Sequence, residues 1–306
     1  MVGSILGRLL AEAGTPPAIV VSRTPASARR AARFSGAAFA TSDLARLPAI
    51  TRLIVIATPH DAIEPVARAL ARLPQLERAR LFVCHTSGML TAAALEPLAR
   101  LGARVFSFHP LQSFPRIFRP AALLASARGI TYGIDGADGS LSMARQLARR
   151  LGGRTVVVPP HLRTYYHAAS VVASTHLAAL TSILAEMFSR LRPTASPRSR
   201  NTSNGNDFYA AYEPLLQGTL ALVKARAPRL AIGGAIARGG VETLEAHLRA
   251  VATHSPDLVL PFSALCLRAI ALAGEGGAVA GERVEAMRRA VVRVALETRD
   301  LDLGSP

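Results

Sequence analysis

The sequence predicts an α/β fold in which a parallel sheet is followed by an all-helical domain. Three observations support this prediction. Short β-rich runs alternate with helical stretches through the first half of the chain. Pro159-Pro160 then ends the alternation, and the remainder has the periodicity of helices. The 306 residues are enough for two separate cores. We therefore expect one domain at 1–159 and a second at 160–306.

Each expected element is bounded by turn-forming residues. The expected strands are Ala18–Ser22, Arg52–Ala57, Arg80–His85, Arg104–Phe108, Ile130–Ile134 and Thr155–Val158. Helices between several of them are expected at Ser4–Ala13, Ala26–Phe34, Pro65–Leu73 and Ala92–Leu101, with glycines at their ends. The second half predicts the helices Thr164–Leu191, Tyr209–Ala225, Val241–Ala252, Asp257–Ala273 and Gly281–Thr298, and a mobile loop at Arg192–Asp207.

The composition is that of a soluble globular protein. Half of the residues are apolar and 18% are charged, which argues against disorder. The uncharged run Ala168–Ala185 is about as long as a membrane span, but its scattered hydroxyl groups favour a buried helix, so we expect no membrane partner. Cys84 and Cys266 lie far apart and suggest no disulfide framework. Without a signal peptide at the start, we expect a cytoplasmic protein.

The formal net charge of +16 raises the alternative of a nucleic-acid binder. The cations are scattered as arginine pairs on expected helices, and Lys224 is the single lysine. No zinc-finger spacing, aromatic RNA-binding motif or tryptophan accompanies them. We therefore expect no nucleic-acid partner, and a basic surface binder stays the weaker alternative.

The first helix resembles the glycine-rich start of a dinucleotide-binding Rossmann fold. In that fold an apolar strand precedes G-x-G-x-x-G, and the next helix points its N-terminus at the pyrophosphate. Here Gly3 stands where the last of these glycines belongs, followed by Ser4, and no strand precedes it. We expect the true start to lie upstream, since the first strand normally lies inside the sheet. The alternative is that Gly3 and Gly7 are ordinary helix glycines.

The end of the next expected strand indicates which dinucleotide binds. NAD enzymes place an acid there for the ribose hydroxyl, whereas NADP enzymes accept an arginine. This chain has Ser22-Arg23-Thr24, with no acid. We therefore expect NADP as the cofactor, although Arg23 is alternatively a plain surface arginine. The loop Ala57-Thr58-Pro59-His60-Asp61, after the following strand, is expected to pass the cofactor through Ala57, Thr58 and Pro59, or else to be a proline turn.

Four polar segments carry the remaining chemistry of the chain. In order they are His85-Thr86-Ser87-Gly88, His109-Pro110-Leu111-Gln112-Ser113-Phe114, Tyr166-His167-Ala168-Ala169 and Gly233-Gly234-Ala235-Ile236-Ala237-Arg238-Gly239-Gly240. Together they resemble a bacterial family of Rossmann-like proteins with a helical C-terminal domain of unknown function. That family is similar to pyrroline-5-carboxylate reductases, ketopantoate reductases and 3-hydroxyacid dehydrogenases. The resemblance covers nearly the whole chain and implies a helical domain like that of 6-phosphogluconate dehydrogenase.

The resemblance implies an NADP(H)-dependent oxidoreductase that reduces a small 2-oxo acid or imino acid. The chain departs from the family pattern at Thr175, where Asn is usual, and at Ala235 and Gly240, where Pro and Asp are usual. No lysine stands at the start of the helical domain, which excludes the proton donor that 3-hydroxyacid dehydrogenases use there. These departures leave open a non-catalytic NADP(H)-binding sensor or partner protein.

Reduction of a carbonyl needs a proton donor, and histidine titrates near neutrality. The catalytic candidates are His167 first, then His109 and His85, each with the alternative of a purely structural role. Arg238 is expected to clamp a substrate carboxylate. Ser87 is expected at the cofactor, and Gln112, Tyr166 and Thr175 at the substrate.

No histidine spacing suggests a metal site. The apolar, weakly charged helices of the second half predict a homodimer built through Thr164–Leu191 and the C-terminal helices.

Overall fold

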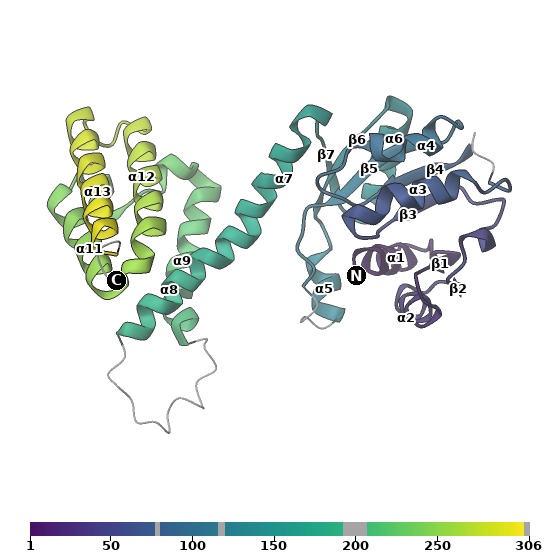
Figure 1. Ribbon diagram of the computed structural model, residues 1–306, viewed down its shortest axis with the longest axis horizontal. Coiled ribbons are helices and arrows are strands. Elements are labelled where there is room, and N and C mark those ends of the chain that lie inside the picture. The colour runs from purple at the N-terminus through teal and green to yellow at the C-terminus, as the bar shows by residue number, and fades with distance from the viewer. Residues whose placement is uncertain (77–79, 116–119, 192–206, 303–306) are drawn as a thin grey trace, which may run out of the picture. The chain divides into compact units, whose positions relative to one another are not determined.

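The computed structural model describes residues 1–76, 80–115, 120–191 and 207–302 (Figure 1). Its contacts divide the chain into two compact units, Met1–His176 and Leu177–Pro306. The last strand of the first unit ends at Val157, near the Pro159 at which the sequence analysis places the boundary. The residues from Arg163 to His176, expected in the helical domain, belong by their contacts to the first unit.

The first unit contains two sheets. Strands β1 (Ile19–Val21) and β2 (Phe39–Thr41) form a parallel pair, in which Val20 faces Ala40. The second sheet has the order β3-β4-β5-β6-β7, with bounds Leu53–Ile56, Phe82–His85, Arg104–Pro110, Thr131–Gly136 and Arg154–Val157. All six expected strands are confirmed, and β2 is one more that the sequence analysis missed. The α/β class with a mostly parallel sheet is thereby confirmed.

One pairing departs from the parallel arrangement. Strands β3, β4 and β5 run parallel, so their carboxyl ends meet at one edge of the sheet. Strand β6 pairs antiparallel with β5 and sets Gly133 directly opposite His109. Because β6 runs the other way, its N-terminal half lies beside the carboxyl end of β5. This register brings a residue without a side chain next to a candidate catalytic histidine.

Helices pack between and around these strands; α5 and α6 were not expected from the sequence. Their bounds in the first unit are α1 Val2–Glu12, α2 Pro25–Ser35, α3 Ile63–Ala71, α4 Glu96–Ala99, α5 Pro120–Ser126, α6 Asp138–Arg150 and α7 Arg163–Val171. Helix α2 shows why the bounds fall where they do. The Thr24 hydroxyl accepts from the Ser27 amide at 3.2 Å, Pro25 opens the first turn, and Gly36 ends the helix at φ 74°.

The two sheets share their cores although no ladder joins them among the described residues. Leu53 and Val55 of β3 pack against the cluster that contains Ile5 and Leu9 of α1. Ile54, on the other face of β3, packs in the same cluster as Val21 of β1. The expected first strand belongs between β1 and β3 in the usual strand order, and it stays a prediction.

The second unit is helical throughout its described elements. It contains α8 (Leu177–Arg190), α9 (Asp207–Arg226), α10 (Gly234–Ala237), α11 (Val241–His254), α12 (Val259–Glu275) and α13 (Gly281–Asp302). Its core is formed by α11, α12 and α13, with Leu248, Ile270 and Val291 fully buried. The expected helices of this half are confirmed, and most of the loop expected at Arg192–Asp207 lies outside the described residues.

Two helical stretches, Pro160–Arg190 and Pro256–Glu275, are long and apolar enough to cross a membrane by length and composition. A five-residue π-helical segment, Val172–His176, joins α7 to α8 in the first stretch. The core helix of a soluble protein passes the same length test, and 28% of the Pro256–Glu275 window is buried. A cytoplasmic location stays a prediction.

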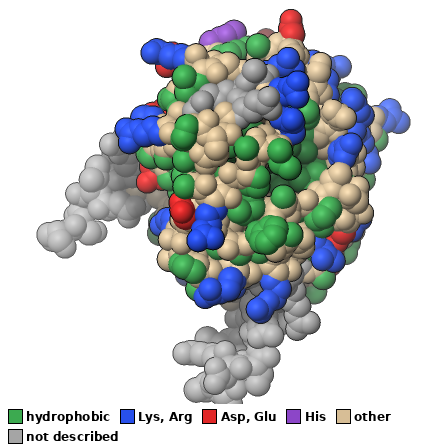
Figure 2. All heavy atoms as spheres, turned by 90° about the vertical axis from the view of Figure 1, so that its right-hand side faces the viewer, with side chains coloured by type: hydrophobic (Ala, Val, Ile, Leu, Met, Phe, Trp, Pro, Cys, Tyr) green, Lys and Arg blue, Asp and Glu red, His purple; other side chains and the backbone are tan. Residues whose placement is uncertain are grey.

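The positive charge does not gather into a stripe on the face of the first unit that Figure 2 shows. Arginine side chains stand around the edge of this face, and hydrophobic side chains gather near its middle. Many arginines elsewhere are paired locally, as Arg8 is with Glu12 and Arg100 with Glu96. Such exposed pairs one helical turn apart are typical of solvated helix surfaces.

Candidate functional site

Three proton-carrying side chains meet where β4 and β5 end. His109, near the carboxyl end of strand β5, places its Nδ1 atom 2.9 Å from the hydroxyl of Tyr166 on α7. His167 follows Tyr166 on the same helix, and its ring centroid lies 5.9 Å from that of His109. Both imidazoles are half-buried, so the group is in contact with solvent without being fully open to it. We call His109, Tyr166 and His167 the proton cluster.

Two glycines make room for the proton cluster. A Cβ atom built on Gly88 would lie 2.2 Å from Cδ2 of His167, 3.0 Å from its Nε2 and 2.9 Å from Nε2 of His109. The Nε2 atoms of both rings therefore face Gly88. A Cβ atom on Gly133 would lie 2.3 Å from the Tyr166 hydroxyl. A side chain at either position would push part of the cluster out of place.

A buried ion pair between Arg163 and Asp135 lies next to the proton cluster. Arg163 on α7 is 1% exposed, and its Nη1 lies 3.3 Å from Oδ2 of Asp135 on β6. The same guanidinium donates through Nη2 to the Ser87 carbonyl at 2.9 Å and lies over the Tyr166 ring, 5.4 Å from its centroid. Arg163 thus connects β6, the turn after β4, and the tyrosine of the cluster.

Asp135 is held from several sides. Its Oδ1 accepts from the Ala92 amide at 2.7 Å, and its Oδ2 accepts from the Ser107 hydroxyl at 2.5 Å. The Asp135 amide in turn donates to Ser107 Oγ at 3.1 Å. A carboxylate removed from water needs such partners to stay charged, and this one also has Arg163. The pair therefore has a fixed position in the fold.

His85, the third candidate histidine, has both ring nitrogens engaged in the fold. It is fully buried; its Nδ1 accepts from the Ser87 amide at 3.2 Å, and its Nε2 lies 2.9 Å from the Thr91 carbonyl. Because Nδ1 accepts, Nε2 carries the proton and donates it to that carbonyl. Burial lowers the pKa of His85, which agrees with a neutral ring. The two hydrogen bonds of His85 therefore stabilise the turn from Ser87 to Thr91.

Ser87 and His60 link the end of β3 to the end of β4. The Ser87 hydroxyl accepts from the Met89 and Leu90 amides, each at 3.2 Å, and shares a 3.2 Å hydrogen bond with Nδ1 of His60. His60 begins the short helical turn His60–Ala62 after β3 and is exposed. The His60–Ser87 hydrogen bond therefore connects the loops after β3 and β4, and Gly88, the next residue, lies against His167.

Burial controls the protonation of the cluster. It is the main cause that lowers the pKa of His109 to about 4, and the positive Arg163 and the neighbouring His167 and His85 lower it further. His109 is therefore neutral at pH 7. Burial also raises the pKa of the Tyr166 hydroxyl, while Arg163 and a hydrogen bond from the Gly133 backbone act in the opposite direction. The phenol is accordingly protonated at pH 7.

The N-terminus of α1 lies against the end of β3, which is the arrangement that a dinucleotide needs. A Cβ atom on Gly3 would lie 2.8 Å from Cβ of Ala57, so glycine permits the close contact. The first turn of α1 has no acidic residue and no side-chain cap. The next residue after Ala57, Thr58, has a buried hydroxyl without a hydrogen-bond partner in the described part of the chain. These features fit a pyrophosphate.

The residues expected at the adenosine end have mixed surroundings. Arg23 follows β1 and is exposed, while the Thr24 hydroxyl already accepts from the Ser27 amide. Ser22 donates its amide to the Thr41 carbonyl of β2, and Ser4 lies within α1. Arg23 is therefore the side chain of this group with a free cationic end. An exposed guanidinium at this position could hold a phosphate of a nicotinamide dinucleotide.

The remaining expected site residues, Gln112, Thr175 and Arg238, have no hydrogen bond, ion pair or ring contact with the proton cluster in the described part of the chain. Gln112 is exposed and donates to the Ser126 carbonyl at 2.9 Å, which connects the segment after β5 to α5. Thr175 lies in the π-helical segment and is exposed. Arg238 belongs to the second unit, directly after α10.

Four residues of the site were not expected from the sequence: Asp135 and Arg163 of the ion pair, and the glycines Gly88 and Gly133. Asp135 could have been found from the sequence, because it directly follows the apolar run Ile130–Ile134, and an acid at the end of a buried strand needs a buried partner. Arg163 had none, since the chain carries 36 lysines and arginines and most of them are exposed.

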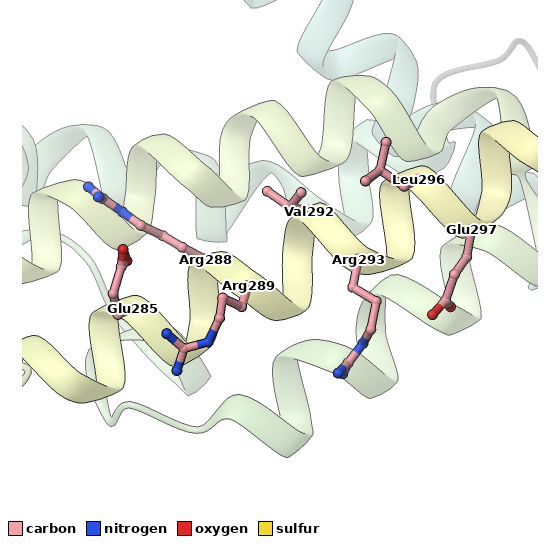
Figure 3. A pocket seen from close by; sticks show the side chains of 7 residues that line it. All are labelled: Glu285, Arg288, Arg289, Val292, Arg293, Leu296 and Glu297. Carbon is pink, nitrogen blue, oxygen red and sulfur yellow. The ribbon is translucent and has the colours of Figure 1, made fainter.

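Two hollows of the described surface are lined by other residues than this cluster. One, in the second unit, is lined by a single helix, α13, and two of its charged residues form ion pairs, Arg293 with Glu245 and Glu297 with Arg249 (Figure 3). Another, in the first unit, lies between the segment from Ala92 to Ala99, the start of β5 and the end of β6. Neither gathers acid–base groups in the way the proton cluster does.

Comparison with known proteins supports the fold. Residues 130–268 match the family model of a domain of unknown function, DUF2520, while no curated protein matches the chain. The structure of TM1727 from Thermotoga maritima is similar, with a TM-score of 0.63, 20% identity and coverage of 97% of both chains. BF3122 from Bacteroides fragilis, whose proposed activity is that of an NADP oxidoreductase, has a TM-score of 0.61 at 20% identity. It covers 83% of this chain, which covers 88% of it.

An imine reductase from Myxococcus stipitatus, in complex with NADP+, is similar with a TM-score of 0.51 and 18% identity. The match covers 96% of this chain and 91% of that one. At this level of identity the comparisons establish the fold. The chain has a Rossmann-type α/β unit followed by a helical C-terminal part, as NADP-binding oxidoreductases of known structure do.

Proposed function

We propose that the protein is an NADP(H)-dependent oxidoreductase that reduces a small 2-oxo acid or imino acid. The observation that carries this proposal is the convergence of His109, Tyr166 and His167 at the strand ends that also face the N-terminus of α1. The two ends of the site are continuous: Gly3 touches Ala57, and the His60–Ser87 hydrogen bond leads from that loop to Gly88 and the cluster. In open α/β sheets, ligands bind at this edge.

Each part of the site then has a distinct task. The first-turn amides of α1 and the Thr58 hydroxyl hold the pyrophosphate, and Arg23 holds the adenosine phosphate. A bound nicotinamide supplies the hydride. The proton cluster supplies the proton to the substrate oxygen or nitrogen, because its groups are half-buried and two of them are imidazoles. Arg238 stays the candidate for the substrate carboxylate.

The structural relatives support an oxidoreductase. The substrate class is proposed from the resemblance of the motif set to reductases of small carbonyl and imine acids. Absorbance at 340 nm reports NADPH oxidation across a panel that includes ketopantoate and pyrroline-5-carboxylate. We expect turnover of at least one acid, and a large loss of turnover in His109→Ala. Absence of NADPH oxidation over the whole panel, with NADPH still bound, would select the non-catalytic sensor instead.

The cofactor preference is tested at Arg23. Removal of a charge-assisted hydrogen bond to phosphate costs about 1.5–3 kcal/mol, which corresponds to roughly 10- to 100-fold in affinity. We expect Arg23→Ser to weaken NADPH binding by this factor and to leave NADH binding nearly unchanged. Arg33→Ser, in the last turn of α2 and therefore at the other end of that helix, is the matched control. Equal losses for both nucleotides would refute the assignment of Arg23.

The homodimer also stays a proposal. The apolar window of Pro160–Arg190 is unburied within the described chain, which leaves a long apolar surface for a second copy. Sedimentation equilibrium at micromolar concentration should give twice the chain mass of 32.2 kDa. A single-chain mass at that concentration would remove the proposal.

A further inference from the structure

The proposed function gives no task to Arg163, although its guanidinium lies over the ring of Tyr166 in the proton cluster. It is 1% exposed, so it cannot contact a substrate, and its charge is nevertheless kept in the interior by Asp135. A buried ion pair is weak evidence for stability, since apolar residues of similar volume often serve as well. Its position against the face of the Tyr166 ring therefore suggests a task in the chemistry.

The Tyr166 hydroxyl and Nδ1 of His109 lie 2.9 Å apart, and each group can donate or accept in this bond. Proton transfer from Tyr166 toward a substrate needs the phenol as the donor and Nδ1 as the acceptor. A neutral imidazole that accepts at Nδ1 carries its proton on Nε2. That Nε2–H is the one that faces Gly88.

We propose that His109, Tyr166 and Arg163 form a proton relay in which His109 donates to the substrate, Tyr166 replaces the donated proton, and Arg163 is the positioning residue. This inference rests on the proposed function for its catalytic meaning. In the step, the Nε2–H bond of His109 breaks as an O–H or N–H bond forms on the reduced substrate. At the same time the Tyr166 proton moves to Nδ1. His109 ends neutral, in its other tautomer, and Tyr166 ends as a phenolate.

The buried cation makes this final state accessible. The phenolate forms beside the Arg163 guanidinium, whose charge favours a negative oxygen. His109 passes a proton without becoming a cation, which its burial and the charge of Arg163 disfavour. Asp135 keeps Arg163 in place and balances its charge at rest. Solvent protonates the phenolate again before the next turnover.

The resting state gives a direct test that needs no substrate. The ¹⁵N shifts of His109 in the unliganded protein, at pH 7, should be those of the neutral tautomer with its proton on Nε2. Tyr166→Phe should remove this preference, because Nδ1 loses its donor. Tyr165→Phe, at an adjacent tyrosine that is 76% exposed, is the matched control and should leave the His109 shifts unchanged. A proton on Nδ1 of His109, or a charged ring at pH 7, would overturn the relay.

The dependence of Arg163 on Tyr166 is tested by a double-mutant cycle with NADPH and ketopantoate. Positioned acid–base groups contribute about 10²- to 10⁴-fold, so Tyr166→Phe should lower kcat by roughly 10² or more with little change in KM. Arg163→Met should lower kcat to a similar level, and the double variant should be no slower than Tyr166→Phe alone. Multiplied losses in the double variant would show that Arg163 acts independently of Tyr166 and would overturn its role in the relay.

The tautomer measurement also separates this inference from the proposed function. A His109 ring with its proton on Nε2 that changes in Tyr166→Phe supports the relay geometry even if ketopantoate is not turned over. NADPH binding and turnover with an Nδ1-protonated His109 would keep the oxidoreductase and remove the relay. If Arg163→Met does not fold, the ¹⁵N shifts of the wild-type protein and of Tyr166→Phe still decide the matter.

Discussion

A histidine stands at the end of β4 and another near the end of β5, and the structure gives the two histidines different environments. His85 is fully buried, with both ring nitrogens bonded to the backbone of its own turn. His109 is half-buried, with one nitrogen bonded to Tyr166 and the other facing Gly88. Residue type and position at a strand end are therefore not enough to identify a candidate catalytic histidine. The hydrogen-bond partners of its two ring nitrogens must be known as well.

The difference follows from the neighbours of the two strands. The turn after β4 folds back on itself through Ser87 and Thr91, so it can satisfy His85 locally. The end of β5 pairs with the antiparallel β6, whose Gly133 leaves room for the Tyr166 side chain of α7. A histidine at the end of β5 therefore meets a side chain from another element instead of its own backbone.

The largest effect is expected at Asp135, because it supports both turns. Asp135→Ala leaves Arg163 buried and unpaired, which costs about 3–5 kcal/mol of unfolding free energy. Urea unfolding followed by circular dichroism measures this loss. Asp138→Ala, an exposed acid in the first turn of α6, is the control and should cost under about 1 kcal/mol. Equal losses for the two variants would show that the buried pair is not special.

Gly88 joins the two turns, and a side chain there should harm the chemistry first. In Gly88→Ala the new Cβ would lie 2.2 Å from Cδ2 of His167, so the imidazole must move. Misplacement of a catalytic group by about 1 Å costs roughly 10²-fold, and we expect this loss in kcat/KM. Gly139→Ala on α6, where a Cβ meets nothing within 4 Å, should have no effect. An active Gly88→Ala would place the chemistry elsewhere.

Replacement of each of the two histidines by alanine should sharpen the comparison. His85→Ala leaves the Ser87 amide and the Thr91 carbonyl without their partner, which costs about 1–3 kcal/mol of stability. His109→Ala should cost less stability and more kcat/KM than His85→Ala. The pair is measured by thermal unfolding and by NADPH oxidation. The reverse order, with His85→Ala as the less active variant, would contradict the separation of the two turns.

His109 should also make the stability of the protein depend on pH. Its folded pKa is about 4, below the value near 6.5 of an unfolded histidine. As the pH falls from about 6.5 to 4, the unfolded state takes up a proton that the folded state refuses, so stability decreases by at most about 1.4 kcal/mol per pH unit. Below pH 4 this contribution is constant. His109→Gln should reduce the slope in this window, and an unchanged slope would show that the ring is already charged.

Most of the fold could be predicted because its signals are local. Apolar runs, helix periodicity and terminal glycines indicated six strands and most helices. Strand β2 was missed because Phe39–Thr41 is only three residues long. The reversal of β6 was missed as well, since the apolar run Ile130–Ile134 reads the same in both directions. Pairing direction depends on the path of the chain, which composition does not show.

Less of the candidate site could be predicted, because its contacts join distant parts of the chain. The sequence indicated His109, Tyr166 and His167 separately, and the structure brings them together. The role of Gly133 depends on the register of β5 with β6, and the role of Arg163 on the position of α7 over β6. His85 and His109 look alike in the sequence, and only the backbone of the turn after β4 distinguishes them.

Binding of a nicotinamide nucleotide to the protein tests the central claim most directly. Isothermal titration calorimetry with NADPH and with NADH measures both affinities under the same conditions. The arrangement of α1, Thr58 and Arg23 predicts saturable binding of NADPH, tighter than that of NADH by roughly 10-fold or more. No heat of binding for either nucleotide, in a protein that unfolds cooperatively, would contradict the assignment of a cofactor site and of the reductase built on it.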